Sequence, residues 1–479
     1  MERMIKNCAV LEAMIQRCAG LDVHKKCIVA CVSIIDEQNK IQRQVRTFST
    51  MTRNLEELSD WLLKEQVSHV AMESTGVLWK PVFNILEEHF TILLCNARHI
   101  KAVPGRKTDV KDCEWIAQLL QHGLVNGSFI PPRAQRDLRD LTRQRAQLNN
   151  EKSREVNRIH KILEDANIKL SCVATDILGA SGRDMLRALI SGQTNEVELA
   201  ELARRRLRGK IPELKEALHG HLTEHHRYML ALHLRHIETV EGMIADLDEH
   251  IARMIAGGEL DSKPKSTGPL TPAKETSPHA EPPTQAISDQ PESSQQSALG
   301  QREPSAPALV PGHLPFNKAI QIIDGISGLG VQSAIDILAE IGVDMSQFPS
   351  DKHISSWAKV CPGNDESAGK RKSGKTGRGN PWLRRVLVQV AWAASHTDSY
   401  LGAMYRRLAR TRGKKRSIIA VAHSILIIIY HLLSRGIEYH DLGADFFDHI
   451  DPARITKYFV KRLESLGYTV SLEKITTVA

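Results

Sequence analysis

Four acidic residues stand at positions from which they could act together. Asp22 ends a short apolar run in AGLDVHKK, and Glu73 ends another in AMESTG. Asp109 and Asp112 lie three residues apart in KTDVKD, so they share one face of the helix expected there. Clustered carboxylates repel one another unless hard cations separate them, and Mg²⁺ prefers oxygen ligands. We therefore expect a site for Mg²⁺, two ions per site, suited to in-line phosphoryl transfer.

Each acid taken alone has a simpler interpretation. A single Asp is more often a helix cap or a surface residue, and Asp109 alone could be an N-cap. His24 and Lys25 follow the first acid and could touch phosphate or water. Because a lone histidine beside a strand is more often simply packed, we assign neither residue a role.

The elements around these acids follow the order of an RNase H-like α/β fold. Three expected strands come first, followed by alternating helices and strands, and in such a sheet the ends of the first and fourth strands are neighbours. Thr52 is the expected cap of the first helix. The expected strands are 19–22, 27–35, 42–49, 67–72 and 90–95, and the expected helices are 52–62, 77–88 and 111–122.

The chain becomes helical after Pro131 and Pro132. Long amphipathic segments at 136–168 and 222–255 predict a helical hairpin or coiled coil, either a dimerisation arm or part of an ordinary bundle. The second half is mostly α. Its segment IDGISGLGVQSAIDILAEIG, Ile323–Gly342, resembles a helix-hairpin-helix whose turn amides face phosphate, although a purely structural turn has the same pattern.

The residues between these halves have a different composition. From 257 to 313 the chain is rich in Pro, Ser, Gln, Thr and Glu and poor in large apolar residues. Such a segment buries too little surface to offset its ordering entropy. We expect a disordered linker or insertion.

Positive charge is concentrated in one stretch of the second half. The whole chain has 64 Lys and Arg against 56 Asp and Glu, a formal charge of +8. Between Lys370 and Arg416 the only acid is Asp398. Such an excess indicates a polyanionic partner, with a solvated basic face as the alternative. The candidate nucleic-acid-binding residues are Lys370, Arg371, Lys372, Lys375, Arg378, Arg384, Arg385, Arg406, Arg407 and Arg410.

The cysteines and apolar runs indicate a cytosolic protein. The eight cysteines contain no CxxC pair, so neither a zinc site nor a disulfide framework is expected, and Cys27 and Cys31 resemble core residues. The N-terminus lacks the pattern of a signal peptide. The run 417–433 is shorter than a membrane span and contains two histidines, which favours a buried helix.

Two sets of motifs resemble one known family. GLDVHK, MESTG and KTDVKDCEWIAQLLQHGL are similar to the RuvC-like N-terminal domain of the DEDD insertion-sequence transposases. The segments IDGISGLGVQSAIDILAEIG and WAKVCPGNDESAGKRKSGKTGRGNPWLRRVLVQVAWAA resemble that family's C-terminal domain. Besides the linker at 257–313, which its composition predicts and which is longer than usual for that family, the expected domains are an extension at 1–17, a catalytic domain at 18–130, a helical region at 131–256, a C-terminal transposase domain at 314–445 and a tail at 446–479.

The resemblance also implies chemistry and partners. Asp22, Glu73, Asp109 and Asp112 would be the DEDD set, and Ser367 would be the serine that attacks DNA and forms a phosphoserine link. A structured non-coding RNA from the element would choose the DNA, and dimers would pair into a tetramer. The setting would be the bacterial cytoplasm, at the nucleoid.

The residues themselves support Ser367 in part. A serine hydroxyl needs a base or a metal to become a good nucleophile. Lys370 and Arg371 could steady phosphate charge, and the surrounding glycines predict a flexible loop that approaches phosphate closely. Ser373 is the rival candidate.

Three other functions compete with this interpretation. A Holliday-junction-type, RNase H-like nuclease would use the acids with water and would not need Ser367. A sugar kinase or actin-like ATPase also begins with Gly-x-Asp on a strand, but it needs a second phosphate loop, for which DGISGLG is the only candidate. A non-catalytic binder has no need of four acids, because acids repel phosphate.

Overall fold

In the structure, which is a computed structural model, the chain divides into two units. The structure describes residues 14–38, 40–74, 76–97, 100, 112–125, 127–261, 314–361, 365–367, 370–373, 376–377, 379–450 and 452–472. Of residues 365–367, 370–373, 454 and 455 it describes the backbone. The first unit holds the described residues up to Pro132, and the second holds those from Arg133 onward.

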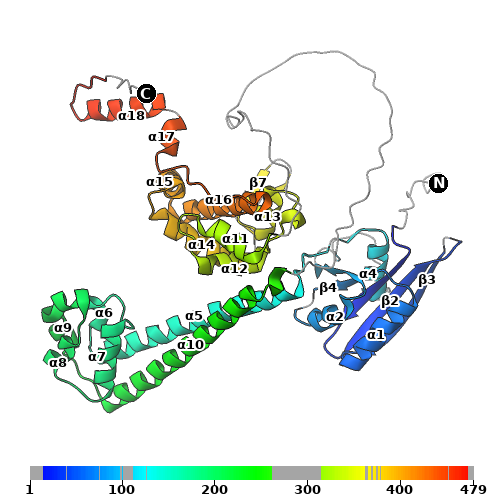
Figure 1. The fold of residues 1–479 in the computed structure, drawn as a ribbon, viewed down its shortest axis with the longest axis horizontal. Helices are drawn as coiled ribbons and strands as arrows, with labels where there is room; N and C mark the ends of the chain where they lie inside the picture. The colour runs from blue at the N-terminus through cyan, green and yellow to red at the C-terminus, as the bar shows by residue number, and fades with distance from the viewer. Residues whose placement is uncertain are drawn as a thin grey trace. The chain divides into compact units, whose positions relative to one another are not determined.

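The first unit is a mixed five-stranded sheet with helices (Figure 1). The strand order is β3-β2-β1-β4-β5; β2 pairs antiparallel with β1 and β3, and β4 pairs parallel with β1 and β5. This arrangement fits the expected RNase H-like fold. The strands are β1 (Arg17–Val23), β2 (Cys27–Ile35), β3 (Ile41–Ser49), β4 (His69–Glu73) and β5 (Thr91–Cys95), and the helices are α1 (Thr52–Lys64), α2 (Trp79–Leu86) and α4 (Asp112–Gln121).

Alternation along the strands assigns side chains to two faces of the sheet. Ala19, Leu21 and Val23 of β1 join the core formed with α1 and α2. On the other face, Cys31 of β2 packs with Cys113 of α4. The expectation that Thr52 caps α1 is wrong: Met51 is the N-cap, and no side chain bonds to the helix end there.

Gly20 allows α4 to lie directly on β1. A Cβ at Gly20 would stand 2.2 Å from the carbonyl oxygen of Cys113 and 2.4 Å from the nitrogen of Ala117. Further along the helix, the Gln121 side chain accepts a hydrogen bond from Ser33, which pairs with Cys18 near the start of β1. Helix α4 therefore runs antiparallel to β1, and its N-terminus points toward the carboxyl end of β1.

The second unit contains a long antiparallel helical hairpin (Figure 1). Its helices are α5 (Arg133–Asp165) and α10 (Glu224–Ala256). Ion pairs cross from one helix to the other, among them Arg145–Asp248 and Lys152–Glu241, each at 2.7 Å. Between them in the chain are α6 (Leu170–Val173), α7 (Ala180–Ile190), α8 (Glu196–Glu201), the 3-10 helix η1 (Arg205–Lys210) and α9 (Ile211–Leu218). This part of the chain shares a hydrophobic core with Ile159 of α5 and Leu230 of α10.

The remaining described chain is mostly helical, as expected. Its core includes Leu138 of α5 and Ile251 of α10, so the base of the hairpin belongs to the same hydrophobic core as the C-terminal helices. The elements are η2 (Glu259–Asp261), α11 (Phe316–Asp324), α12 (Val331–Ile341), η3 (Met345–Gln347), α13 (Asp351–Ala358), β6 (Asp365–Ser367), β7 (Lys370–Ser373), α14 (Pro381–Ser395), α15 (Tyr400–Arg412), α16 (Lys414–Arg435), α17 (Phe446–Ile450) and α18 (Pro452–Ser465).

Helix α16 lies at the centre of this core. Within the described chain it is the one helix long and apolar enough to cross a membrane. Its residues Val421, Ile425 and Ile429 are fully buried among neighbouring helices. The interpretation of 417–433 as a buried helix is confirmed.

The first residues of the expected linker are folded. Residues 259–261 form η2, where Leu260 is buried and Asp261 accepts a hydrogen bond of 2.7 Å from the backbone of Phe316. These residues are therefore part of the folded unit, because they pack on it and bond to it. The rest of the expected linker, 262–313, lies outside the described residues.

Candidate active site and nucleic-acid interface

The sheet brings two of the four acids together. Leu21 of β1 pairs with Met72 of β4 in parallel register, and Asp22 and Glu73 are the next residues of these strands. Neighbouring strands lie about 4.8 Å apart. Both acids fall on the face that α4 covers, opposite the Leu21 and Met72 core. Asp22 and Glu73 are therefore neighbours at the carboxyl ends of adjacent strands.

Asp112 comes to the same end of the sheet. It is the first residue of α4, one position before Cys113, which lies over Gly20. Since α4 runs antiparallel to β1, its first turn lies toward Asp22. Asp109 lies outside the described residues.

At the carboxyl end of β1, His24 contacts Asp22, although the sequence alone assigned His24 no role. Its Nε2 lies 3.1 Å from Oδ2 of Asp22, whose side chain is 25% exposed. The sequence held a signal for this contact, because Asp22 and His24 are two residues apart and such residues share one face of an extended chain. Among the described residues no three His, Cys, Asp or Glu side chains are grouped closely enough to hold a metal ion.

The Ser367 segment is not the flexible loop that its glycines suggested. Asp365–Ser367 and Lys370–Ser373 form a two-stranded antiparallel hairpin with Ser367 opposite Lys370. Backbone pairing holds these described residues, because each paired strand satisfies the other's amides and carbonyls. Ser367 is the last residue of the first strand, and Ser373, its rival, lies at the far end of the second.

The chain on both sides of this hairpin is firmly held. A Cβ at Gly379 would stand 2.3 Å from the carbonyl oxygen of Ala358, so the two ends of the segment touch. Asn380 caps α14 by accepting hydrogen bonds from two backbone amides, and its Nδ2 donates to Glu340 at 2.5 Å. Arg384 donates to the hydroxyl of Thr376 at 2.8 Å. The serine-bearing hairpin is therefore anchored to buried structure.

The candidate basic residues fall into distinct environments. Arg385 donates to the carbonyl of Ala146 on α5, and Arg406 pairs with Asp398. The Arg407 guanidinium lies 5.1 Å from the Phe447 ring centre, and Arg410 is exposed. Of Lys370, Arg371 and Lys372 the structure describes the backbone in β7, and Lys375 and Arg378 lie outside the described residues.

The Gly-rich turn of the second half has a packing role. It joins α11 to α12, and Gly328 has φ +84° with its missing Cβ 2.4 Å from the backbone nitrogen of Ala394. Only glycine fits both the angle and the contact. Phosphate binding by the turn stays a prediction.

The described cysteines are free thiols, and most are buried. Burial raises the pKa of Cys18, Cys31 and Cys95 to about 12. Cys31 packs in the core as expected, whereas Cys27 is partly exposed. The buried thiols are core residues and not nucleophiles.

Comparison with known families matches both parts of the chain. Residues 19–168 match the DEDD model of the IS110 transposases, described as Transposase, and residues 320–406 match the model described as Transposase IS116/IS110/IS902 family. No curated protein matches the chain. The N-terminal match contains the sheet with Asp22, Glu73 and Asp112, and the C-terminal match contains the Ser367 hairpin. The chain belongs to the IS110 family of DEDD transposases, and it is a DNA-binding transposase enzyme.

Proposed function

We propose that this transposase cuts and rejoins DNA through a covalent serine–DNA link, with the carboxylate end of the N-terminal sheet and Ser367 acting on the same phosphate. The observation that carries the proposal is the placement of Asp22 and Glu73 on adjacent strands beneath the first turn of α4. With Asp109 they would form an all-oxygen donor set, which suits Mg²⁺. Two bound ions would neutralise charge on the phosphoryl oxygens.

Ser367 is the proposed nucleophile. Its Oγ forms a bond to phosphorus while one ester P–O bond of the DNA breaks, and the serine proton leaves with the strand's new hydroxyl or with solvent. The hydroxyl of another strand then attacks the phosphoserine and regenerates Ser367. The link conserves the phosphodiester bond energy, so rejoining needs no nucleotide cofactor. The anchored base of the hairpin supports this role, because a nucleophile must be held in position to react.

The partners follow from the family resemblance. A structured non-coding RNA from the element would select the DNA, and the enzyme would act as a dimer that pairs into a tetramer. The hairpin of α5 and α10 is the proposed dimerisation arm, and the setting is the bacterial cytoplasm at the nucleoid. The exposed Tyr228, Leu232 and Met243 on α10 support the arm, because large apolar side chains exposed at helical spacing are suited to a partner.

A nicked suicide DNA substrate tests the nucleophile. Ser367→Ala should lose both strand cleavage and the protein–DNA adduct, while DNA binding persists because the change removes only one hydroxyl. Ser373→Ala is the matched control in the same hairpin, and it should keep the adduct. Mass spectrometry of the digested adduct should place the modification on Ser367.

Two results would refute this assignment. An adduct on Ser373, or normal recombination by Ser367→Ala, would show that Ser367 is not the nucleophile. Cleavage by the unmodified enzyme without any adduct would favour the water-using nuclease instead.

A further inference from the structure

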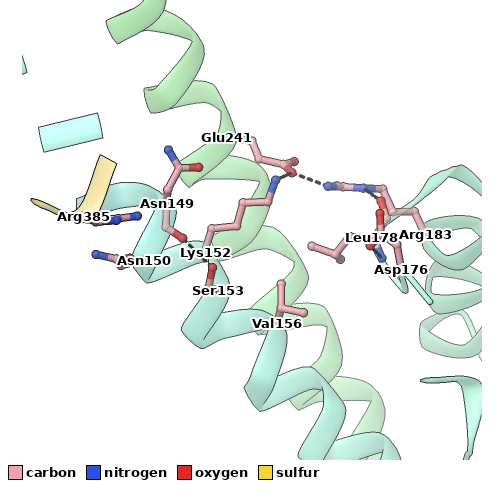
Figure 2. A pocket seen from close by; sticks show the side chains of 10 residues that line it. All are labelled: Asn149, Asn150, Lys152, Ser153, Val156, Asp176, Leu178, Arg183, Glu241 and Arg385. Carbon is pink, nitrogen blue, oxygen red and sulfur yellow. Dashed lines mark hydrogen bonds and ion pairs between the residues drawn. The ribbon is translucent and has the colours of Figure 1, made fainter. Parts of the chain in front are cut away.

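A polar pocket lies in the second unit. It has a volume of about 510 Å³ and lies between the hairpin helices α5 and α10, the segment before α7, and Arg385 of α14 (Figure 2). The lining includes three cations, Lys152, Arg183 and Arg385, and two acids, Asp176 and Glu241. Cationic charge therefore exceeds anionic charge on its walls.

Two of the cations, Lys152 and Arg183, are held in place by one carboxylate. Glu241 pairs with Lys152 at 2.7 Å and with Arg183 at 2.5 Å, so two positive charges share one carboxylate (Figure 2). Partial burial alone would raise the pKa of Glu241, but the hydrogen bonds from Lys152 and Arg183 outweigh it and lower the pKa. The Glu241 carboxylate thus orients both cations. Its single negative charge balances only one of their two positive charges.

Arg385 supplies the charge at the other end. Among the described residues its guanidinium makes one hydrogen bond, of 3.3 Å, to the carbonyl of Ala146. A guanidinium carries five N–H donors in a planar fork that matches phosphate. The hydrogen bond to the Ala146 carbonyl uses one of these donors, and a carbonyl has no net charge that would neutralise the guanidinium. Arg385 also interacts electrostatically with Asp336, but its guanidinium makes no second hydrogen bond among the described residues, so most of its donors stay available for an anion in the pocket.

The rest of the lining selects the kind of anion. Asn149, Asn150 and Ser153 of α5 add amide and hydroxyl groups, whereas Val156 and Leu178 are the only apolar side chains in the lining. No aromatic ring lines the pocket, so a base has nothing to stack on. Small-molecule pockets are mostly apolar. Amides, hydroxyls and arginine or lysine cations are instead the groups that contact phosphates and sugars.

We propose that this pocket binds the sugar-phosphate backbone of a nucleic-acid strand, with Arg385 and Lys152 as its main cationic contacts. For DNA the proposal rests on the transposase function, and for RNA it rests on the proposed guide. Arg385 lies near the start of α14, the helix that follows the serine-bearing hairpin. A strand held here would be positioned along the arm without being read for sequence.

Fluorescence anisotropy of the full chain tests the pocket. The probes are labelled single-stranded RNA, single-stranded DNA and duplex DNA of one arbitrary sequence, titrated across a range of salt. Arg385→Gln should weaken binding about tenfold at low salt and reduce the slope of log Kd against log salt by about one. Arg154→Gln is the matched control, because it makes the same change on an exposed residue of α5 outside the pocket lining.

A second variant keeps the test decisive if Arg385→Gln disturbs folding. Asn150 is exposed and lines the pocket, so Asn150→Asp places a negative charge there without removing a buried contact. It should weaken binding at low salt and have little effect at high salt. Asn157→Asp, on the same helix outside the lining, should bind as the unmodified chain does.

The three probes identify the bound strand. Weakening with RNA alone supports a site for the guide, and weakening with DNA alone supports a site for the element or target. Unchanged affinity and salt slope in both Arg385→Gln and Asn150→Asp would overturn the pocket proposal and leave the transposase function intact. An unmodified chain that bound neither DNA nor RNA would overturn both.

Discussion

At the scale of single residues, the candidate chemistry depends on side chains that are far apart in the sequence. Asp22 and Glu73 are 51 residues apart by their numbers, and the parallel pairing of β1 and β4 makes them neighbours. His24 then contacts Asp22 directly. A contact of this kind can fix the orientation of a carboxylate, so His24 is a candidate positioning residue.

Removing one carboxylate at a time tests this group. Asp22→Asn, Glu73→Gln and Asp112→Asn should each reduce DNA strand cleavage in Mg²⁺ by at least about a hundredfold, because each removes charge that stabilises the reacting phosphate through bound ions. Each variant should still fold. Its melting temperature without metal should stay the same or rise, because the substitution removes one of several mutually repelling negative charges.

Asp60→Asn is the matched control for these variants. Asp60 is an exposed acid on α1, the helix on the opposite face of the sheet. Its loss should leave cleavage unchanged. If Asp22→Asn, Glu73→Gln and Asp112→Asn also cleaved DNA at the normal rate, the carboxylate site would be wrong.

At the scale of elements, the end of α12 is joined to α5 through buried charge. Glu340 is 2% exposed and accepts two hydrogen bonds from Arg143, at 2.7 and 2.8 Å. Arg139 donates to the carbonyls of Ala339 and Glu340 and so satisfies the last turn of α12. Burial is the largest effect on Arg139 and lowers its pKa, although the Glu340 carboxylate opposes that shift. The same Glu340 also bonds Asn380, the cap of α14.

Glu340→Ala should destabilise the second unit strongly. Removing the carboxylate leaves buried guanidinium groups without their partner, which costs about 3–5 kcal/mol. Denaturant unfolding followed by circular dichroism measures this loss. Glu249→Ala, which removes an exposed partner of Arg253 on α10, should change the free energy of unfolding by at most about 0.5 kcal/mol. Equal effects for the two variants would show that the buried network is not a stabilising junction.

At the scale of the whole molecule, the segment 262–313 separates parts of the chain that share one core. Leu138, Ile251 and Ile255 precede it, and Phe316 and Ile323 follow it, yet all belong to the same buried cluster. Apolar burial of this extent holds surfaces together without a covalent connection. The C-terminal helices and the base of the hairpin therefore fold as one body.

Limited proteolysis tests this organisation. The Pro- and Ser-rich composition of 262–313 predicts rapid cleavage there, because such segments cannot bury surface. The two fragments should separate on a denaturing gel but elute together from a native sizing column, held by the shared core. Resistance to protease across this segment would contradict the compositional prediction, and native separation of the fragments would contradict the shared core.

Much of the first unit could be predicted from the sequence. Short apolar runs, together with the polar-alternating segment 42–49, predicted the strands of the sheet, and the observed bounds agree within a few residues. Asp22 and Glu73 were recognisable because each stands where an apolar run ends, and Asp109 and Asp112 because they are three residues apart. The cap at Thr52 was predicted wrongly, since local preference does not decide where a helix begins once its residues pack.

Other features were outside the reach of pattern alone. The glycines near Ser367 suggested a loop, but residues 365–367 pair with residues 370–373, and such pairing depends on residues meeting in space. The pocket around Arg385 joins α5, α7, α10 and α14, whose side chains have no common spacing in the sequence.

The sequence by itself determined which segments form strands and helices and which residue types can do chemistry, because periodicity and residue type are local properties. Only the tertiary structure decided that Asp22 neighbours Glu73 and that α4 packs directly on Gly20. It also decided that Glu340 joins α5 to the N-terminal cap of α14. These contacts join residues distant along the chain, and their geometry comes from strand register and close packing, which no local pattern contains.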